Sequence, residues 1–221
     1  MVKHLGEEQQ AQTRLRAALF EAYAEDRANN REPKLKDILR TNIPYLDAFI
    51  EEVLRFKNPS LAFNRVALED LTISSHYVPK ETMIIFATYG PALNNAGSPI
   101  DECVRSESSQ KHHNDVPGDW ADSPFPPEEF HPERWLKTSE DGAAAVFDPK
   151  AGPMLAFASG LRMCWGRRLA YLELRPVVTL FVWNFVFEKL PADLHDWDVR
   201  NDLFLEPRHA RVKLSGVPRA E

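Results

Sequence analysis

Phe157-Ala-Ser-Gly-Leu-Arg-Met-Cys-Trp-Gly-Arg-Arg-Leu-Ala170 is the most informative segment of the chain, because it surrounds one cysteine, Cys164, with residues that suit a thiolate. A buried thiolate needs nearby positive charge and backbone N–H groups, since a bare buried anion is costly. Gly160 and Gly166 let the main chain approach a flat cofactor, and Arg162 offers a charged fork for a carboxylate. The residues after Gly166 favour a helix, whose N-terminus would favour negative charge at the sulfur. Most lone cysteines are simply small hydrophobic residues, so Cys164 by itself leaves both interpretations open.

Two charged motifs lie upstream of this segment. Residues 45–56 are predicted to form a helix in which Glu52 and Arg55, spaced i,i+3, lie on one face. Alone, the motif E-x-x-R would be read as a solvated pair worth about 0.2–0.5 kcal/mol. The segment Phe130-His-Pro-Glu-Arg-Trp135 then contributes a second arginine, Arg134, ahead of the cysteine.

The pattern F-x-x-G-x-R-x-C-x-G, followed by an alanine, resembles the cysteine-ligand loop of the cytochrome P-450 superfamily, the haem-thiolate monooxygenases. The residues that match it are Phe157, Gly160, Arg162, Cys164, Gly166 and Ala170. The resemblance implies that Cys164 is the axial ligand of the iron of haem b. In that family the thiolate donates electron density toward the oxygen bound to the iron. It also implies that Phe157 shields the sulfur and that Gly160 and Gly166 shape the cofactor-binding loop.

Two arginines are implied to hold the haem propionates. Arg162 lies in the cysteine loop, and Arg65 follows Arg55 by ten residues, as the family's second propionate-binding arginine does. For Arg65 the alternative is an exposed arginine on a strand.

In the same family, the two charged residues of E-x-x-R join the later arginine in a buried network. The resemblance assigns Glu52, Arg55 and Arg134 to this network as scaffold residues, and it leaves no catalytic residue visible here beyond the haem ligand. Two guanidiniums around one carboxylate leave excess positive charge, so we expect further acceptors among the backbone carbonyls of the intervening loop. The three motifs also stand in the family's order.

Residue patterns and resemblance together predict a mainly α fold with small β-sheets (α+β), the proximal half of the cytochrome P-450 fold, over residues 1–221. A one-sided apolar stripe predicts a helix from Glu7 to about Ala24. The other predicted elements are the E-x-x-R helix 45–56, small strands within 61–87, a polar insertion 90–118, the P-E-R segment 130–135, the cysteine-ligand loop 157–166, a long helix 165–190 and a terminal hairpin 203–214. Pro176 predicts either a bend near Arg175 or two helices in place of the long one.

Composition excludes several classes of protein. The 221 residues are 43% hydrophobic, enough for a sizeable core, and the net charge of −6 argues against nucleic acid as a partner. Two cysteines give no disulfide framework, which predicts a reducing compartment. The longest apolar run, Val177–Phe187, is too short to span a membrane. The insertion 90–118 holds Cys103 and the pair His112-His113, but without metal-ligand spacing a solvated insertion is favoured over a metal site.

The resemblance implies an oxidoreductase that inserts one atom of O₂ into a small lipophilic substrate, with NADPH supplying electrons through a reductase or another donor. Arg167, Arg168 and Arg175 form a candidate docking patch for that partner, with a solvated helix face as the alternative. Leu61 and Phe63 are candidate substrate-facing residues.

The family's long central helix carries an acid and a threonine that deliver protons to bound oxygen, and we find no counterpart upstream of Glu7. We therefore expect a truncated chain that is inactive alone. The alternative is a catalytically inactive haem-binding fragment or a non-functional truncation product. For a full-length eukaryotic relative the resemblance implies the cytoplasmic face of the endoplasmic reticulum membrane, and we expect no membrane anchor in this chain.

Overall fold

The computed structural model describes residues 1–218 except for 74, 89–100, 112–119, 121–122 and 202–203. Its α-helices are α1 (Val2–Glu7), α2 (Gln9–Ala22), α3 (Ala24–Ala28), α4 (Leu35–Ile38), α5 (Pro44–Phe56), α7 (Glu107–Lys111) and α8 (Arg167–Asn184). Its 3-10 helices are η1 (Glu102–Val104), η3 (Pro132–Trp135) and η4 (Gly160–Arg162).

Short strands accompany the helices and pair two by two. They are β1 (Ala62–Val66), β2 (Leu71–Ile73), β3 (His76–Val78), β4 (Met83–Ala87), β5 (Leu136–Thr138), β6 (Ala145–Phe147), β7 (Phe185–Glu188), β8 (Val199–Asn201), β9 (Leu205–Pro207) and β10 (Lys213–Gly216). Antiparallel pairs form between β1 and β4, β2 and β3, β5 and β6, β7 and β10, and β8 and β9. The predicted α+β class is confirmed.

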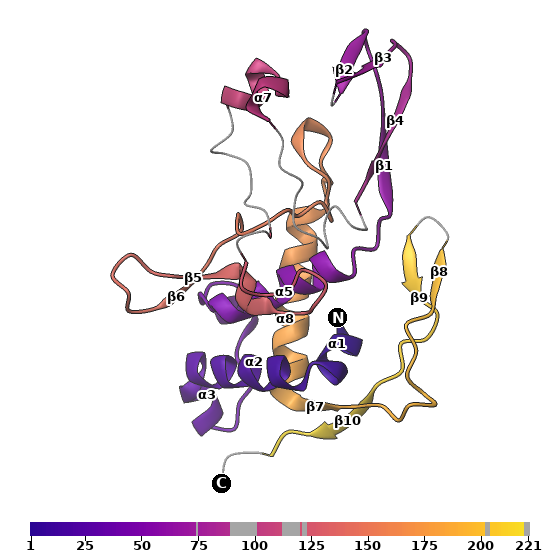
Figure 1. The fold of residues 1–221 in the computed structure, drawn as a ribbon. Coiled ribbons are helices and arrows are strands. Elements are labelled where there is room, and N and C mark those ends of the chain that lie inside the picture. Colours follow the sequence, from indigo (N-terminus) through magenta and orange to yellow (C-terminus); the bar gives the residue numbers. More distant parts are fainter. Residues whose placement is uncertain (74, 89–100, 112–119, 121–122, 202–203, 219–221) are drawn as a thin grey trace.

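The main core lies where α2 and α5 pack against the long helix α8 (Figure 1). Helices α1, α2, α4 and α5 each bury apolar side chains in this core. The most deeply buried side chains include Leu5, Leu15, Leu19, Leu46, Phe49, Ile50, Val178, Val182 and Phe187. Pro44 occupies the first turn of α5, where its missing N–H has no helical partner to lose. This packing fixes α5, which carries Glu52 and Arg55.

The helix predicted from Glu7 to about Ala24 is confirmed as α2 over Gln9–Ala22, and its ends differ because Glu8 separates it from α1 and Tyr23 separates it from α3. Glu8 lies between the first two helices with φ −92° and ψ 67°, outside the helical region. Gln12 explains the break, since its side-chain amide donates to the carbonyls of Leu5 and Phe187, each at 2.8 Å. Its Oε1 also accepts the Phe187 N–H at 2.8 Å. These contacts turn α1 toward β7.

The helix predicted over 165–190 is wrong at its C-terminal end, because α8 stops at Asn184. Residues Phe185–Glu188 form β7 instead, pairing with β10, which follows it by more than 20 residues. The run Phe185-Val-Phe-Glu suits a strand once that partner is present. Of the two alternatives predicted at Pro176, a bend or two helices, the second is wrong, since α8 runs through that residue. Leu172, whose carbonyl loses its helical partner there, lies on the exposed side.

The predicted terminal hairpin 203–214 is wrong in its pairing. Leu205–Pro207 pairs with Val199–Asn201, whereas Lys213–Gly216 pairs with β7. The two halves of the predicted hairpin therefore belong to different sheets, because β10 finds its partner at the end of α8.

Most of the predicted insertion 90–118 lies outside the described residues, including His112 and His113. Its described part, 101–111, contains η1 and α7, and Cys103 there is exposed. Among the described residues, no helix has the length and apolar character that crossing a membrane requires.

A buried histidine lies at the start of the chain. His4 is 1% exposed and stacks on Phe130 with ring centroids 4.8 Å apart, while Trp197 covers it at 4.9 Å. Neither ring nitrogen has a hydrogen-bond partner among the described residues. Burial lowers the pKa of His4 from 6.5 to about 3, since its charged form would lose water without gaining a partner.

This buried histidine should make the fold sensitive to acid. Below pH 6.5 the unfolded chain binds a proton at His4 that the folded chain refuses until pH falls to about 3. We expect the free energy of unfolding to fall by up to about 1.4 kcal/mol per pH unit across that window through this residue. Urea titrations across this pH window should show a shallower loss for His4→Phe than for the parent. A parallel slope for the His4 variant would contradict the assignment.

Candidate functional site

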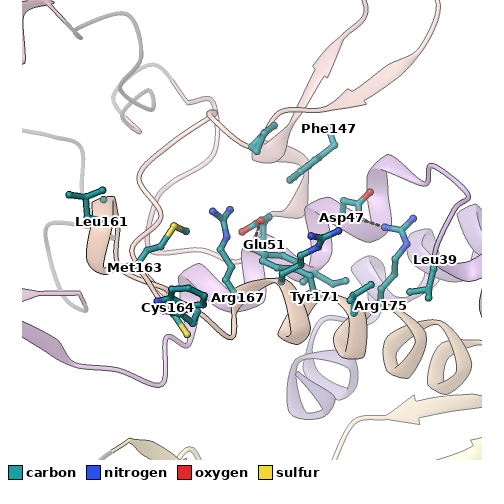
Figure 2. Close-up of a pocket in the computed structure, with 16 residues that line it drawn as sticks. Leu39, Asp47, Glu51, Phe147, Leu161, Met163, Cys164, Arg167, Tyr171 and Arg175 are labelled. Carbon is teal, nitrogen blue, oxygen red and sulfur yellow. Dashed lines mark hydrogen bonds and ion pairs between the residues drawn. The ribbon is translucent and has the colours of Figure 1, made fainter.

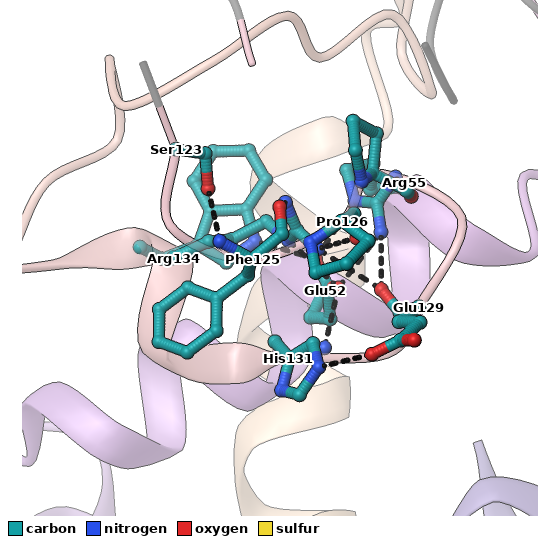
Figure 3. A network of polar contacts seen from close by, with 10 residues as sticks. Glu52, Arg55, Ser123, Phe125, Pro126, Glu129, His131 and Arg134 are labelled. Carbon is teal, nitrogen blue, oxygen red and sulfur yellow. Dashed lines mark hydrogen bonds and ion pairs between the residues drawn. The ribbon is translucent and has the colours of Figure 1, made fainter. Parts of the chain in front are cut away.

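The carboxylate of Glu52 is the most heavily bonded group in the described structure. It is 0% exposed, and Arg55 donates to both of its oxygens, from Nε to Oε2 and from Nη2 to Oε1, each at 2.8 Å. Arg134 Nε donates to Oε1 at 3.0 Å. The backbone N–H of His131 reaches Oε1 at 2.8 Å, and Trp135 Nε1 reaches Oε2 at 2.9 Å. Figure 3 shows Arg55, His131 and Arg134 gathered around Glu52.

Backbone carbonyls of the loop before η3 take up the remaining guanidinium donors, which confirms the expectation from charge balance. Arg55 donates to the carbonyls of Pro127 at 2.8 Å and Glu129 at 3.2 Å. Arg134 donates to the carbonyls of Phe125, Pro126 and Glu129. Burial lowers the pKa of Arg134 and the Glu52 carboxylate opposes that effect. The structure thus brings Glu52, Arg55 and Arg134 together as one fully bonded cluster.

The indole of Trp120 covers this cluster and also contacts Gly152, which precedes the cysteine loop. Trp120 lies over the guanidiniums of Arg134 and Arg55, at 4.9 and 5.5 Å from ring centre to guanidinium carbon. Gly152 packs directly against that indole, where an added Cβ would come within 2.2 Å of a ring carbon. Only a glycine fits there without displacing the ring.

The cysteine loop itself is held by its own backbone. The N–H of Cys164 donates to the carbonyl of Phe157 at 2.9 Å, which closes the loop around η4. Gly160 takes a φ of +73°, a conformation that glycine adopts without strain. Gly166 caps α8, and an added Cβ there would lie 3.7 Å from the sulfur. The sulfur therefore sits just before a helix N-terminus, which favours negative charge on it.

The surface around Cys164 is exposed and apolar. The thiol is exposed, and large apolar side chains of the loop and of α8 stand free of the rest of the chain. Leu161 is 101% exposed, Trp165 98% and Leu169 58%. Arg162 is exposed beside them. Cys164 and Leu161 also border a cavity of about 860 Å³ between the loop, α5 and α8 (Figure 2).

The structure does not join Arg65 to the cysteine loop through any contact among described residues. Arg65 lies half-buried on β1, where it donates to the carbonyl of Asn64 at 2.7 Å and covers the ring of Phe63 at 4.7 Å. Phe63 in turn stacks on Phe86 with ring centroids 5.1 Å apart, and Leu61 is exposed just before the strand.

The prediction that Arg175 belongs to the docking patch is wrong. Arg167 and Arg168 are exposed on α8, but the side chain of Arg175 is only 14% exposed. Its guanidinium forms an ion pair with Asp47 and donates to the carbonyls of Ile38 and Thr41. Arg175 therefore holds α8 against α4 and α5, because those elements cover the face of α8 that the sequence pattern left open.

Sequence reasoning missed several residues that complete the site. His131 contributes only its backbone N–H and leaves no residue-type signal. Trp135 follows Arg134 directly, so its position in the motif was the one available clue. Glu51 and Tyr171, hydrogen-bonded at 2.5 Å between α5 and α8, carried no pattern.

A family model supplies the decisive comparison, since the one described as "Cytochrome P450" matches residues 1–96 and 125–214. The chain belongs to the cytochrome P450 family. The match includes all three motifs, and it omits residues 97–124, which include most of the predicted polar insertion 90–118.

Several curated cytochrome P450 relatives match nearly the whole chain. Cytochrome P450 monooxygenase TRI13 of Fusarium sporotrichioides is 34% identical over 98% of this chain. A cytochrome P450 monooxygenase of Dothistroma septosporum, cyp3.1, is 33% identical over 97% of the chain, which spans 70% of that relative. The chain spans 38% of the Fusarium protein and 33% of a Pestalotiopsis microspora relative that is 36% identical.

Solved cytochrome P450 structures share the fold. A zebra fish cytochrome P450, determined with abiraterone, superimposes with a TM-score of 0.67 at 26% identity. The superposition covers 98% of this chain and 43% of that one. The fold of this chain therefore matches part of the fold of that solved cytochrome P450.

Cytochromes P450 contain haem, and the residues around Cys164 fit that group. A flat apolar macrocycle matches the exposed side chains of Leu161 and Trp165, which would otherwise face water. The exposed thiol ahead of a helix N-terminus provides a thiolate donor, and glycine at position 166 keeps the space beside the sulfur open. Arg162 offers a charge for a propionate.

Removing the central carboxylate should destabilise the chain strongly. Glu52→Ala leaves Arg55 and Arg134 buried without their anion, a loss that typically costs about 3–5 kcal/mol. We expect that decrease in the free energy of unfolding, measured by urea titration, and with it loss of haem incorporation. Glu69→Ala, at an exposed turn, serves as the matched control. Normal haem binding and unchanged melting in the Glu52 variant would show that the cluster is dispensable.

Proposed function

We propose that this chain forms the proximal, haem-thiolate part of a monooxygenase, an oxidoreductase that inserts one atom of O₂ into a lipophilic organic substrate. The observation that best supports this proposal is the loop around Cys164. The thiol is exposed, and the backbone N–H of Cys164 donates to the Phe157 carbonyl at 2.9 Å, just before the N-terminus of α8. Haem b with a cysteine ligand supplies oxygen activation in such enzymes. The names of the curated relatives support the same reaction class.

In this proposal the chain's own residues bind and orient the cofactor. Cys164 would provide the sulfur ligand of the haem iron, two residues before the N-cap of α8 at Gly166. Arg162 and Arg65 would hold propionates. Arg65 uses Nη1 for the Asn64 carbonyl, and its guanidinium has four further N–H donors for a propionate. Phe157 shields the sulfur, and the cluster of Glu52, Arg55 and Arg134 fixes the protein behind the loop.

Electrons are proposed to arrive from NADPH through a reductase or another donor protein. Arg167 and Arg168 support a docking site for an acidic partner, because both are exposed on the first turn of α8, next to the loop. A solvated helix face remains the alternative for these two residues. Leu61 and Phe63 are proposed to face the substrate. For the whole protein we propose the cytoplasmic face of the endoplasmic reticulum membrane, by analogy with eukaryotic relatives.

A second candidate function is haem binding without turnover by these 221 residues. One observation on helix α2 favours this second function. Thr13 on α2 follows Gln12 rather than an acid, and its hydroxyl donates to the Gln9 carbonyl within the same helix at 2.8 Å. That helix therefore shows no acid–threonine pair for delivering protons.

The first test concerns the ligand. With haem added under reducing conditions, carbon monoxide should give the red-shifted Soret band of thiolate ligation. Cys164→Ser should abolish that band, because serine provides no thiolate, while Cys103→Ser, at the other exposed cysteine, should keep it. Equal loss in both variants, or a histidine-type spectrum in the parent, would rule out Cys164 as ligand.

The second test concerns turnover. Oxygen activation requires a proton donor within hydrogen-bond reach and a pocket that excludes bulk water. We expect the 221-residue chain, supplied with a reductase and a panel of lipophilic substrates, to consume NADPH slowly and release hydrogen peroxide. NADPH oxidation, peroxide and hydroxylated product are measured together, with Cys164→Ser as the control. Product formed in step with NADPH consumption would show that these residues suffice for the reaction.

A further inference from the structure

Helix α5 carries a second buried carboxylate beside the one that binds the arginines. Glu51 is 5% exposed, and its Oε1 accepts the hydroxyl of Tyr171 on α8 at 2.5 Å. Consecutive residues on a helix point about 100° apart. Glu52 therefore faces the arginine cluster while Glu51 faces α8, as Figure 2 shows for Glu51 and Tyr171.

Tyr171 is also in contact with the cysteine loop. Its ring lies against Phe157 with centroids 5.6 Å apart, and the guanidinium of Arg167 lies over it at 5.7 Å. Phe157 in turn provides the carbonyl that accepts the N–H of Cys164 at 2.9 Å. A continuous set of contacts thus runs from Glu51 through Tyr171 and Phe157 to the backbone of Cys164.

We propose that Glu51 and Tyr171 are a positioning pair for Cys164, holding Phe157 in place so that its carbonyl can fix the cysteine backbone. The proposal rests on the proposed function only in taking Cys164 as the haem ligand. A tyrosine whose hydroxyl is bonded to a buried acceptor has a restricted ring orientation, and here that ring supports Phe157. Neither residue touches the position of the iron ligand directly, so both act through Phe157.

The first arm of the test needs no haem. In a Cys103→Ser background, ¹⁵N-cysteine labelling leaves one amide signal, that of Cys164, whose hydrogen exchange reports on its bond to Phe157. We expect exchange about tenfold faster in Tyr171→Phe and in Glu51→Ala, a size within the range for losing one ordinary hydrogen bond. Glu51→Gln should exchange like the parent, because its amide oxygen can accept the Tyr171 hydroxyl.

A matched control separates this effect from general loosening. Tyr45→Phe removes another hydroxyl that donates from α5 to a carboxylate, that of Glu133 at 3.0 Å, away from the cysteine loop. We expect parental exchange at Cys164 in this variant. Equal acceleration in Tyr45→Phe and Tyr171→Phe, or an unprotected Cys164 amide in the parent, would overturn the proposal.

The second arm reads the iron ligand. In the reduced, carbon monoxide-bound chain, Tyr171→Phe and Glu51→Ala should lower the ratio of thiolate-ligated to other haem about tenfold. Glu51→Gln and Tyr45→Phe should keep the parental ratio. A parent without a thiolate band, combined with the expected exchange pattern, would refute the proposed function and leave the positioning pair intact. An unchanged ratio in Tyr171→Phe would refute the positioning pair and leave the proposed function standing.

Discussion

The site depends on one buried carboxylate, that of Glu52, whose hydrogen bonds all come from protein donors. Glu52 accepts from two guanidiniums, an indole N–H and a backbone N–H while 0% exposed. A buried charge is tolerated only when it is paired and its partners are themselves satisfied, and here loop carbonyls satisfy the partners. Since every donor comes from α5 or from residues 131–135, this one group fixes the two segments to each other.

Helix α5 therefore serves two sides of the molecule. Toward η3 it presents Glu52 and Arg55, and toward α8 it presents Asp47 and Glu51, which bind Arg175 and Tyr171. Tyr171 contacts the cysteine loop at Phe157, and Gly152, five residues before Phe157, packs against the indole of Trp120. A thiolate ligand needs such support, because its own loop consists of turns and a short 3-10 helix.

The sequence alone predicts features that depend on residues close together in the chain. It does not predict features that depend on contacts between distant segments. Cys164 with its two glycines, and the charged pair at Glu52 and Arg55, follow from local spacing together with a family resemblance. The end of α8 did not, since β7 exists only because β10 pairs with it. Arg175 likewise reads as a surface residue until the backbone of residues 38–41 is placed against it. Periodicity identifies which residues share a face, but it cannot identify what covers that face.

The cluster around Glu52 also has a consequence for synthesis on the ribosome. Arg134 lies 82 residues after Glu52. The carboxylate therefore remains hydrated, and α5 remains unattached to residues 131–135, until those residues have left the exit tunnel. A half-assembled cluster would leave a charge dehydrated without its partners, which disfavours intermediates and makes closure nearly all-or-none. Residues 157–166 emerge only afterwards. The chain order thus allows the cluster around Glu52 to close before the cysteine loop and α8 emerge.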